Sequence, residues 1–107
     1  MKNTTKETQE QVDKKFIEMA DAFIAVANEQ CDKGVVDHRL VNASLLYASA
    51  RFSAFITASI AESKEDYEKA TDKAVEFYSA EFNKMLEEHM KQYKIVFDKK
   101  PKAEYKY

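Results

Sequence analysis

Arg51 is the side chain of this sequence best placed to hold a ligand. It carries the one formal charge within residues 40–61. A guanidinium is planar and can hold a carboxylate or a phosphate through two parallel hydrogen bonds. One hypothesis is therefore a ligand-binding site in which Arg51, Tyr47 and Asn28 contact a small anionic molecule in a pocket between helices.

The same arginine also suits a structural ion pair with an acidic residue on a neighbouring helix. Asp13 and Glu81 are the two candidates, because each lies close to an apolar side of its own helical segment. No second basic residue and no glycine-rich anion loop accompany Arg51, as they do in dedicated phosphate sites. The structural interpretation is therefore favoured over the binding site.

The histidines and the cysteine do not have the spacing of a metal or redox site. His38 and His89 are the only histidines, and Leu86 stands three residues before His89. Di-iron helical bundles need a glutamate at that position. Cys31 has no second cysteine to pair with and is best interpreted as a small apolar residue, with a reactive thiol as the less favoured alternative. We predict no metal and no cofactor.

Catalytic motifs and a nucleic-acid footprint are both missing from the sequence. It contains no nucleophile elbow, phosphate loop or dinucleotide fingerprint. The net charge is −2 and the pI about 5.7, which does not favour binding to nucleic acid. We predict no catalytic residues, and the sequence favours a protein that is not an enzyme.

Helical periodicity accounts for almost the whole chain. Gly and Pro occur once each, which indicates long, uninterrupted helices. Asp37 and Ser63 are predicted N-caps, the latter in a capping box with Asp66, and Gly34 is predicted to end the first helix. The fold class that we predict is all-α: an antiparallel three-helix bundle with a long C-terminal helix, with helices over 11–33, 37–61 and 64–97.

This organisation predicts a single helical domain. We expect a polar lead-in at 1–10, which lacks the apolar core of a signal peptide, a helical domain at 11–98 and a solvated tail at 99–107. The single cysteine is compatible with a reducing cytosol, so we expect a cytoplasmic protein. Residues 40–61 are long enough to span a membrane, but Arg51 at their midpoint makes insertion costly and we expect no membrane contact.

The central helix shows three different sides. Phe52 and Phe55 belong to a bulky side that we expect to be buried, and alanines spaced by four form a small-residue side that allows close helix packing. The third side is uncharged, which is unusual for a surface exposed to water. We predict that it is the contact surface of a homodimer, formed by Asn42, Leu46, Ser49, Ser53 and Ile60.

Three segments carry a resemblance to a known family. They are Phe16-x-x-x-Ala20-x-x-Phe23-Ile24 with Ala27-Asn28-Glu29-Gln30, Tyr47-Ala48-x-Ala50-Arg51-Phe52-x-Ala54-Phe55, and Phe82-x-x-Met85-Leu86-Glu87-Glu88. The chain resembles, over about residues 14–98, a family of small all-helical proteins of Gram-negative bacteria known as a domain of unknown function. The resemblance implies an all-helical fold and a bacterial origin, and it supplies no reaction or catalytic residue.

Two function hypotheses follow. The first is a non-enzymatic interaction module that works as a homo-oligomer through the uncharged side of the central helix. The second is a helical protein that binds a small ligand near Arg51.

Overall fold

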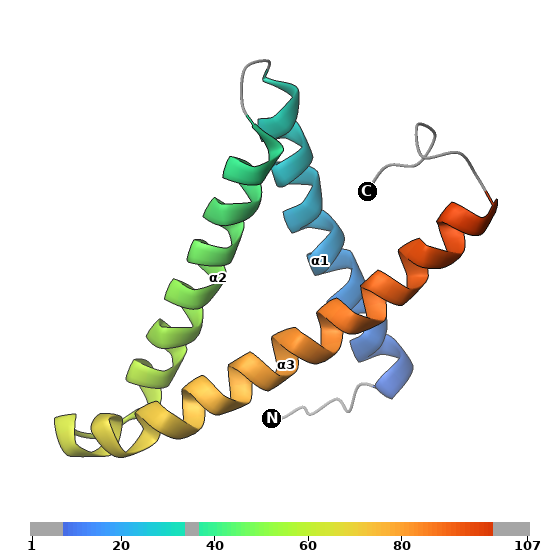
Figure 1. Cartoon of the computed structure of the whole chain (residues 1–107). Coiled ribbons are helices and arrows are strands. Elements are labelled where there is room, and N and C mark those ends of the chain that lie inside the picture. The colour runs from blue at the N-terminus through green and yellow to red at the C-terminus, as the bar shows by residue number, and fades with distance from the viewer. Residues whose placement is uncertain (1–7, 34–36, 100–107) are drawn as a thin grey trace. The chain divides into compact units, whose positions relative to one another are not determined.

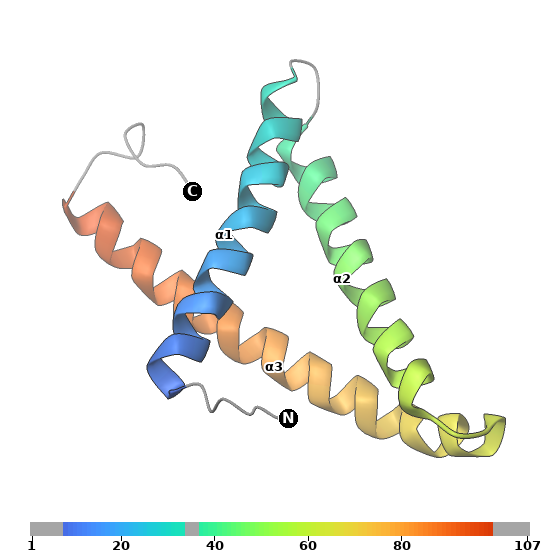
Figure 2. The same cartoon turned by 180° about the vertical axis from the view of Figure 1, so that it is seen from behind.

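The computed structural model describes residues 8–33 and 37–99 and forms three long helices from them (Figure 1). They are α1 (Gln9–Asp32), α2 (His38–Ile60) and α3 (Lys64–Lys99). No strand occurs among the described residues. The predicted all-α class and the long C-terminal helix are confirmed, and the structure is consistent with a helical bundle. Figure 2 shows from behind that α3 continues without a break between its two ends.

The first helix begins two residues before the predicted start because Thr8 caps it. The Thr8 hydroxyl accepts a hydrogen bond from the backbone N–H of Gln11 at 3.1 Å, and the Gln11 side chain accepts one from the backbone N–H of Thr8 at 2.8 Å. This reciprocal pair is a capping box. The Thr-x-x-Gln spacing was a visible signal that the sequence analysis missed.

Both N-caps that were predicted are present. The Asp37 carboxylate accepts from the backbone N–H of Arg39 at 2.8 Å, and the Ser63 hydroxyl accepts from the backbone N–H of Asp66 at 3.1 Å. The return bond of the second cap goes one residue further back, since Asp66 accepts from Glu62 N–H at 3.4 Å. The predicted helix end at Gly34 lies outside the described residues.

The chain divides into two compact units, residues 1–47 and 48–107, with the boundary inside α2. In the first unit, the end of α1 and the start of α2 lie side by side (Figure 1). Val41 is 6% exposed and is the one buried residue of the described chain, while Cys31 and Leu45 are half-buried. The small apolar cluster of this unit therefore holds the end of α1 against the start of α2.

In the second unit, small side chains enclose the contact between α2 and α3. Ser53 and Thr57 on α2 are half-buried, as are Ala70 and Ala74 on α3. Small residues let two helix backbones approach closely. The enclosed side of α2 is therefore that of Ser53, a residue predicted for the uncharged side, while the neighbouring Ala50 and Ala54 line the same contact but remain exposed.

The expectation that Phe52 and Phe55 are buried is wrong for the described chain. They are 63% and 59% exposed, and their rings lie 5.9 Å apart at 33°. Residues three apart are neighbours on a helix surface, so the two rings cover each other in part. Because α2 turns its small side toward α3, its bulky side points away from that contact.

Replacing Thr8 by alanine should destabilise the chain through the loss of a cap. We expect Thr8→Ala to lower the free energy of unfolding by about 1 kcal/mol, since the N–H of Gln11 loses its acceptor. Urea denaturation followed by circular dichroism measures this change. The matched control is Thr8→Ser, which keeps the hydroxyl and should stay close to the native value; equal losses in both variants would contradict the capping role.

Candidate functional site

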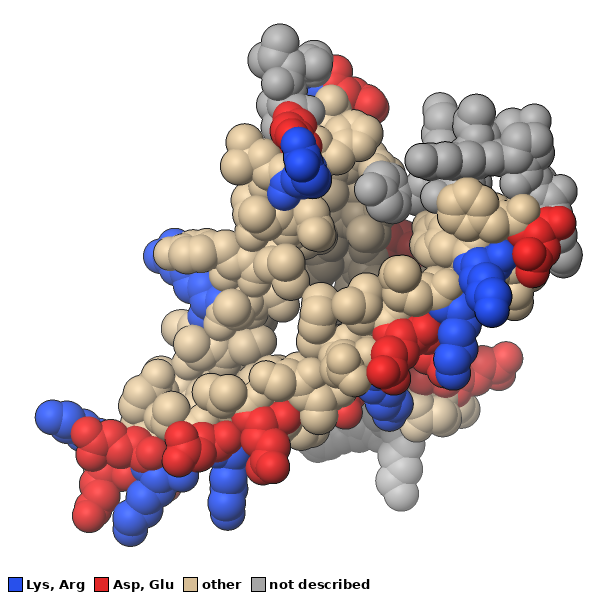
Figure 3. Space-filling model, in the orientation of Figure 1, with Lys and Arg blue, Asp and Glu red and all other residues tan. Residues whose placement is uncertain are grey.

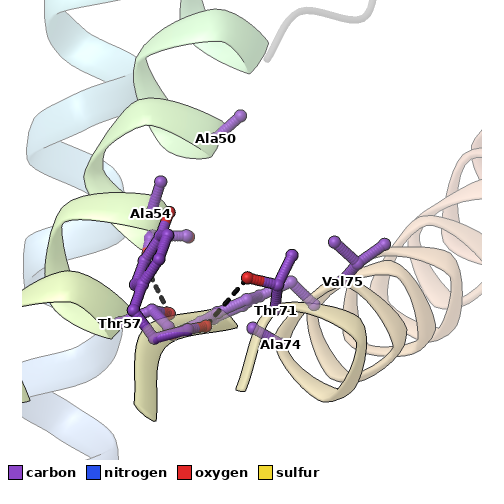
Figure 4. Close-up of a pocket in the computed structure, with 9 residues that line it drawn as sticks. Ala50, Ala54, Thr57, Thr71, Ala74 and Val75 are labelled. Carbon is purple, nitrogen blue, oxygen red and sulfur yellow. Dashed lines mark hydrogen bonds between the residues drawn. The ribbon is translucent and has the colours of Figure 1, made fainter. Parts of the chain in front are cut away.

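A shallow pocket lies within the second unit, between the end of α2 and the start of α3 (Figure 4). Its volume is about 140 Å³, below the roughly 300–1,000 Å³ of typical small-molecule sites. Four side chains of α2 and five of α3 line it: Ala50, Ser53, Ala54, Thr57, Tyr67, Thr71, Ala74, Val75 and Tyr78.

Two of the hydroxyls that line this pocket are directed to their own helices. The Thr57 hydroxyl donates to the carbonyl of Ser53 at 3.0 Å, and the Thr71 hydroxyl donates to the carbonyl of Tyr67 at 2.9 Å (Figure 4). A hydroxyl has one donor hydrogen, so a hydroxyl that donates to the backbone cannot also donate a hydrogen bond to a ligand. The pocket therefore has the character of a packing seam between two helices.

The three predicted ligand-binding residues do not line this pocket. Arg51 and Tyr47 are exposed on α2, and Asn28 is half-buried near the end of α1. Arg51 belongs to the second unit, whereas Tyr47 and Asn28 belong to the first. The proposed binding site near Arg51 stays a prediction.

Neither predicted ion-pair partner of Arg51 is seen bound to it. Among residues 8–33 and 37–99, the structure records no hydrogen bond and no ion pair for Arg51. Asp13 instead accepts a hydrogen bond from the side-chain nitrogen of Gln9 at 2.8 Å. Glu81 is half-buried on α3.

The residues predicted as the dimer surface fall into two groups. Leu46 and Ile60 are 43% and 76% exposed, and Asn42 and Ser49 are exposed beside them on α2. Ser53 is different, because it is half-buried and lines the seam with α3. Four of the five residues are thus on open surface of the described chain.

A close ion pair marks the start of α2. The Arg39 guanidinium donates to both carboxylate oxygens of Asp37, at 3.2 Å from Nε and 2.8 Å from a terminal nitrogen. These side-chain bonds lower the pKa of Asp37 below its usual value, with the backbone N–H of Arg39 as a second cause. They raise the pKa of Arg39 in turn. Both side chains are largely exposed, so the ion pair adds little to the free energy of unfolding and acts mainly at the start of α2.

The remaining candidates for chemistry lie apart. His38 and His89 are exposed on different helices, and Cys31 is a half-buried free thiol. Within the described part of the chain, no three His, Cys, Asp or Glu side chains gather in a way that could hold a metal ion. No helix there is both long and apolar enough to cross a membrane.

Charge is distributed unevenly between the helices. Figure 3 shows lysines and acidic residues in a row along α3, whereas α2 presents mostly uncharged surface on the same face. In α2 the lysine and arginine residues are Arg39 and Arg51 alone, and it has no acidic residue. A largely uncharged helix surface is the feature of this chain that most resembles a binding surface.

Comparison with known families gives one result. Residues 16–94 match the family described as "Protein of unknown function (DUF3144)". The chain belongs to this family. The match agrees with the resemblance seen in the sequence, and the family description names no reaction, ligand or partner. No curated protein and no solved structure matches the chain.

The pKa of Asp37 predicts a pH effect at the start of α2. A carboxylate with a lowered folded pKa contributes its full stabilisation above the unfolded value of about 3.9 and loses it as the pH falls through the folded value. We expect the native chain to be more stable than an Asp37→Asn variant at neutral pH and to lose that advantage below about pH 4. Asparagine keeps the cap, so the difference isolates the charge.

The measurement is the free energy of unfolding of both chains between about pH 6 and pH 3. Arg39→Ala is the matched control, because it removes the hydrogen bond that is the largest cause of the lowered Asp37 pKa. In this variant most of the pH-dependent difference in the free energy of unfolding should disappear. Unfolding free energies of the native and Asp37→Asn chains that run parallel over this range would contradict the prediction.

Proposed function

We propose that the chain is a non-enzymatic interaction module that works as a homo-oligomer. The observation that carries this proposal is the uncharged surface of α2, on which the apolar side chains of Leu46 and Ile60 are exposed. Val41 is the one buried apolar residue of the described part, whereas 24 large apolar side chains are exposed there. Exposed apolar surface on this scale is typical of chains that are covered by a partner.

The free energy involved favours such a partner. Burying a leucine, isoleucine or phenylalanine side chain is worth about 1.5–3 kcal/mol relative to leaving it in water. Domains are stable by only about 5–15 kcal/mol in total. Covering even a few of the exposed side chains would therefore change the stability of this chain substantially.

The contact surface that we propose includes the uncharged side of α2. Leu46 and Ile60 provide its apolar part, and Asn42 and Ser49 lie beside them. An apolar centre with neutral polar neighbours is the usual composition of an interface core, from which charged residues are depleted. Ser53 lies on the same side of α2 but is half-buried and lines the α2–α3 seam, so the proposed surface adjoins that seam.

The proposed setting is the bacterial cytoplasm. The free thiol of Cys31 supports a reducing compartment, in which thiols stay unpaired. The bacterial origin is taken from the family resemblance. The pocket between α2 and α3 does not include Arg51 and gives no support to the binding of a small ligand there.

Sedimentation equilibrium tests the proposal directly. We expect the native chain to exceed its monomer mass of 12.4 kDa at high micromolar concentration. Leu46→Lys should weaken association about tenfold or more, because it places a charge in the proposed contact.

Leu40→Lys is the matched control, since Leu40 is also exposed but projects from another side of α2. This variant should associate like the native chain. A native chain that stays at 12.4 kDa at high micromolar concentration would overturn the proposal, and its apolar surfaces would then be covered within one chain.

A further inference from the structure

The second half of α3 lies beyond the pocket that α2 shares with it. α2 has 23 residues and α3 has 36, which correspond to about 35 and 54 Å. α3 is therefore about 13 residues longer than α2. Only residues 61–63 join the two helices.

The second half of α3 carries an apolar face. Phe82, Leu86 and Met90 follow one another at four-residue spacing, and all three are exposed, Met90 to 65%. Residues at this spacing lie above one another on one side of a helix. The pocket that α2 shares with α3 ends at Tyr78, before this face begins.

Charges of opposite sign lie on the two sides of Met90 along the helix, with Glu87 three residues before it and Lys94 four residues after it. Within four residues of Met90, Glu87 and Glu88 precede it, and Lys91 and Lys94 follow it. Glu87 and Lys94 are seven residues apart, close to two helical turns, so both lie on the same edge of the apolar face. Both are exposed.

We propose that residues 82–97 of α3 pair with the same segment of a second copy, antiparallel, about a two-fold axis near Met90. In such a pair, Glu87 of each copy lies opposite Lys94 of the other, and symmetry makes this contact twice. The apolar faces meet along the axis. A parallel pair would instead place Glu87 level with the second copy's Glu87. The inference rests on the proposed homo-oligomer and specifies a contact for it.

Charge reversal provides the test. Glu87→Lys sets lysine against lysine at both contacts, and Lys94→Glu sets glutamate against glutamate. We expect each variant alone to associate on the order of tenfold more weakly than the native chain at low ionic strength, because two attractive pairs become repulsive. Mixing the two variants in equal amounts should restore association, since each supplies the charge that the other needs.

The control is Glu76→Lys, an exposed glutamate eleven residues before Glu87 on the same edge of α3 but outside the paired segment. It should associate like the native chain. Sedimentation equilibrium gives the masses, and circular dichroism verifies that each variant keeps its helix content.

The outcomes separate the two proposals. A native chain that is monomeric overturns the homo-oligomer and this inference with it. A native chain that associates, with reversals that have no effect or a mixture that does not recover, overturns the α3 pairing and leaves the homo-oligomer standing. Loss in both single variants with recovery in the mixture supports the antiparallel pair.

Discussion

The distribution of apolar residues over more than one side of each helix is the constraint on which this structure depends. A helix with a single narrow apolar stripe can bury it against one neighbour. In α1, exposed apolar residues such as Phe16, Ile17 and Met19 point in different directions. In a chain of three helices, each helix has at most two neighbouring helices. Part of the apolar surface of a helix with several apolar sides is therefore exposed to water unless another molecule covers it.

Within α2 the same constraint explains which side packs and which stays open. Ala50 and Ala54 allow close approach and line the seam with α3, so the bulky rings of Phe52 and Phe55 point elsewhere. The hydroxyls of Ser44, Thr57 and Ser59 donate to carbonyls of their own helix at 2.8–3.0 Å. Hydroxyls used in this way make a helix surface less polar than its composition suggests.

Helix ends were predictable from the sequence because capping is local. Asp37 and Ser63 act on backbone groups two or three residues away, so no distant part of the chain decides the outcome. The start of α1 was placed two residues late only because the Thr8 box was overlooked. Burial was less predictable. Phe52 was assigned to a core from its spacing, but spacing identifies a side of a helix without showing which neighbour packs on that side.

The candidate site shows the same limit in its charges. Local geometry near a cap sets the state of Asp37, and the sequence did contain that cap, although its pairing with Arg39 was not foreseen. Arg51 is exposed, and no hydrogen bond or ion pair is recorded for it among residues 8–33 and 37–99, so its two candidate partners stay predictions.

In a chain of this kind, affinity and specificity have separate sources. Apolar faces such as that of Leu86 and Met90 provide affinity, because burial is non-directional and scales with area. Such faces would also accept many wrong partners. Charges at the edge, such as Glu87 and Lys94, contribute little energy each but penalise a wrong register or orientation when like charges meet. The alternation of apolar and charged residues along α3 thus supplies the two properties that a selective self-contact requires.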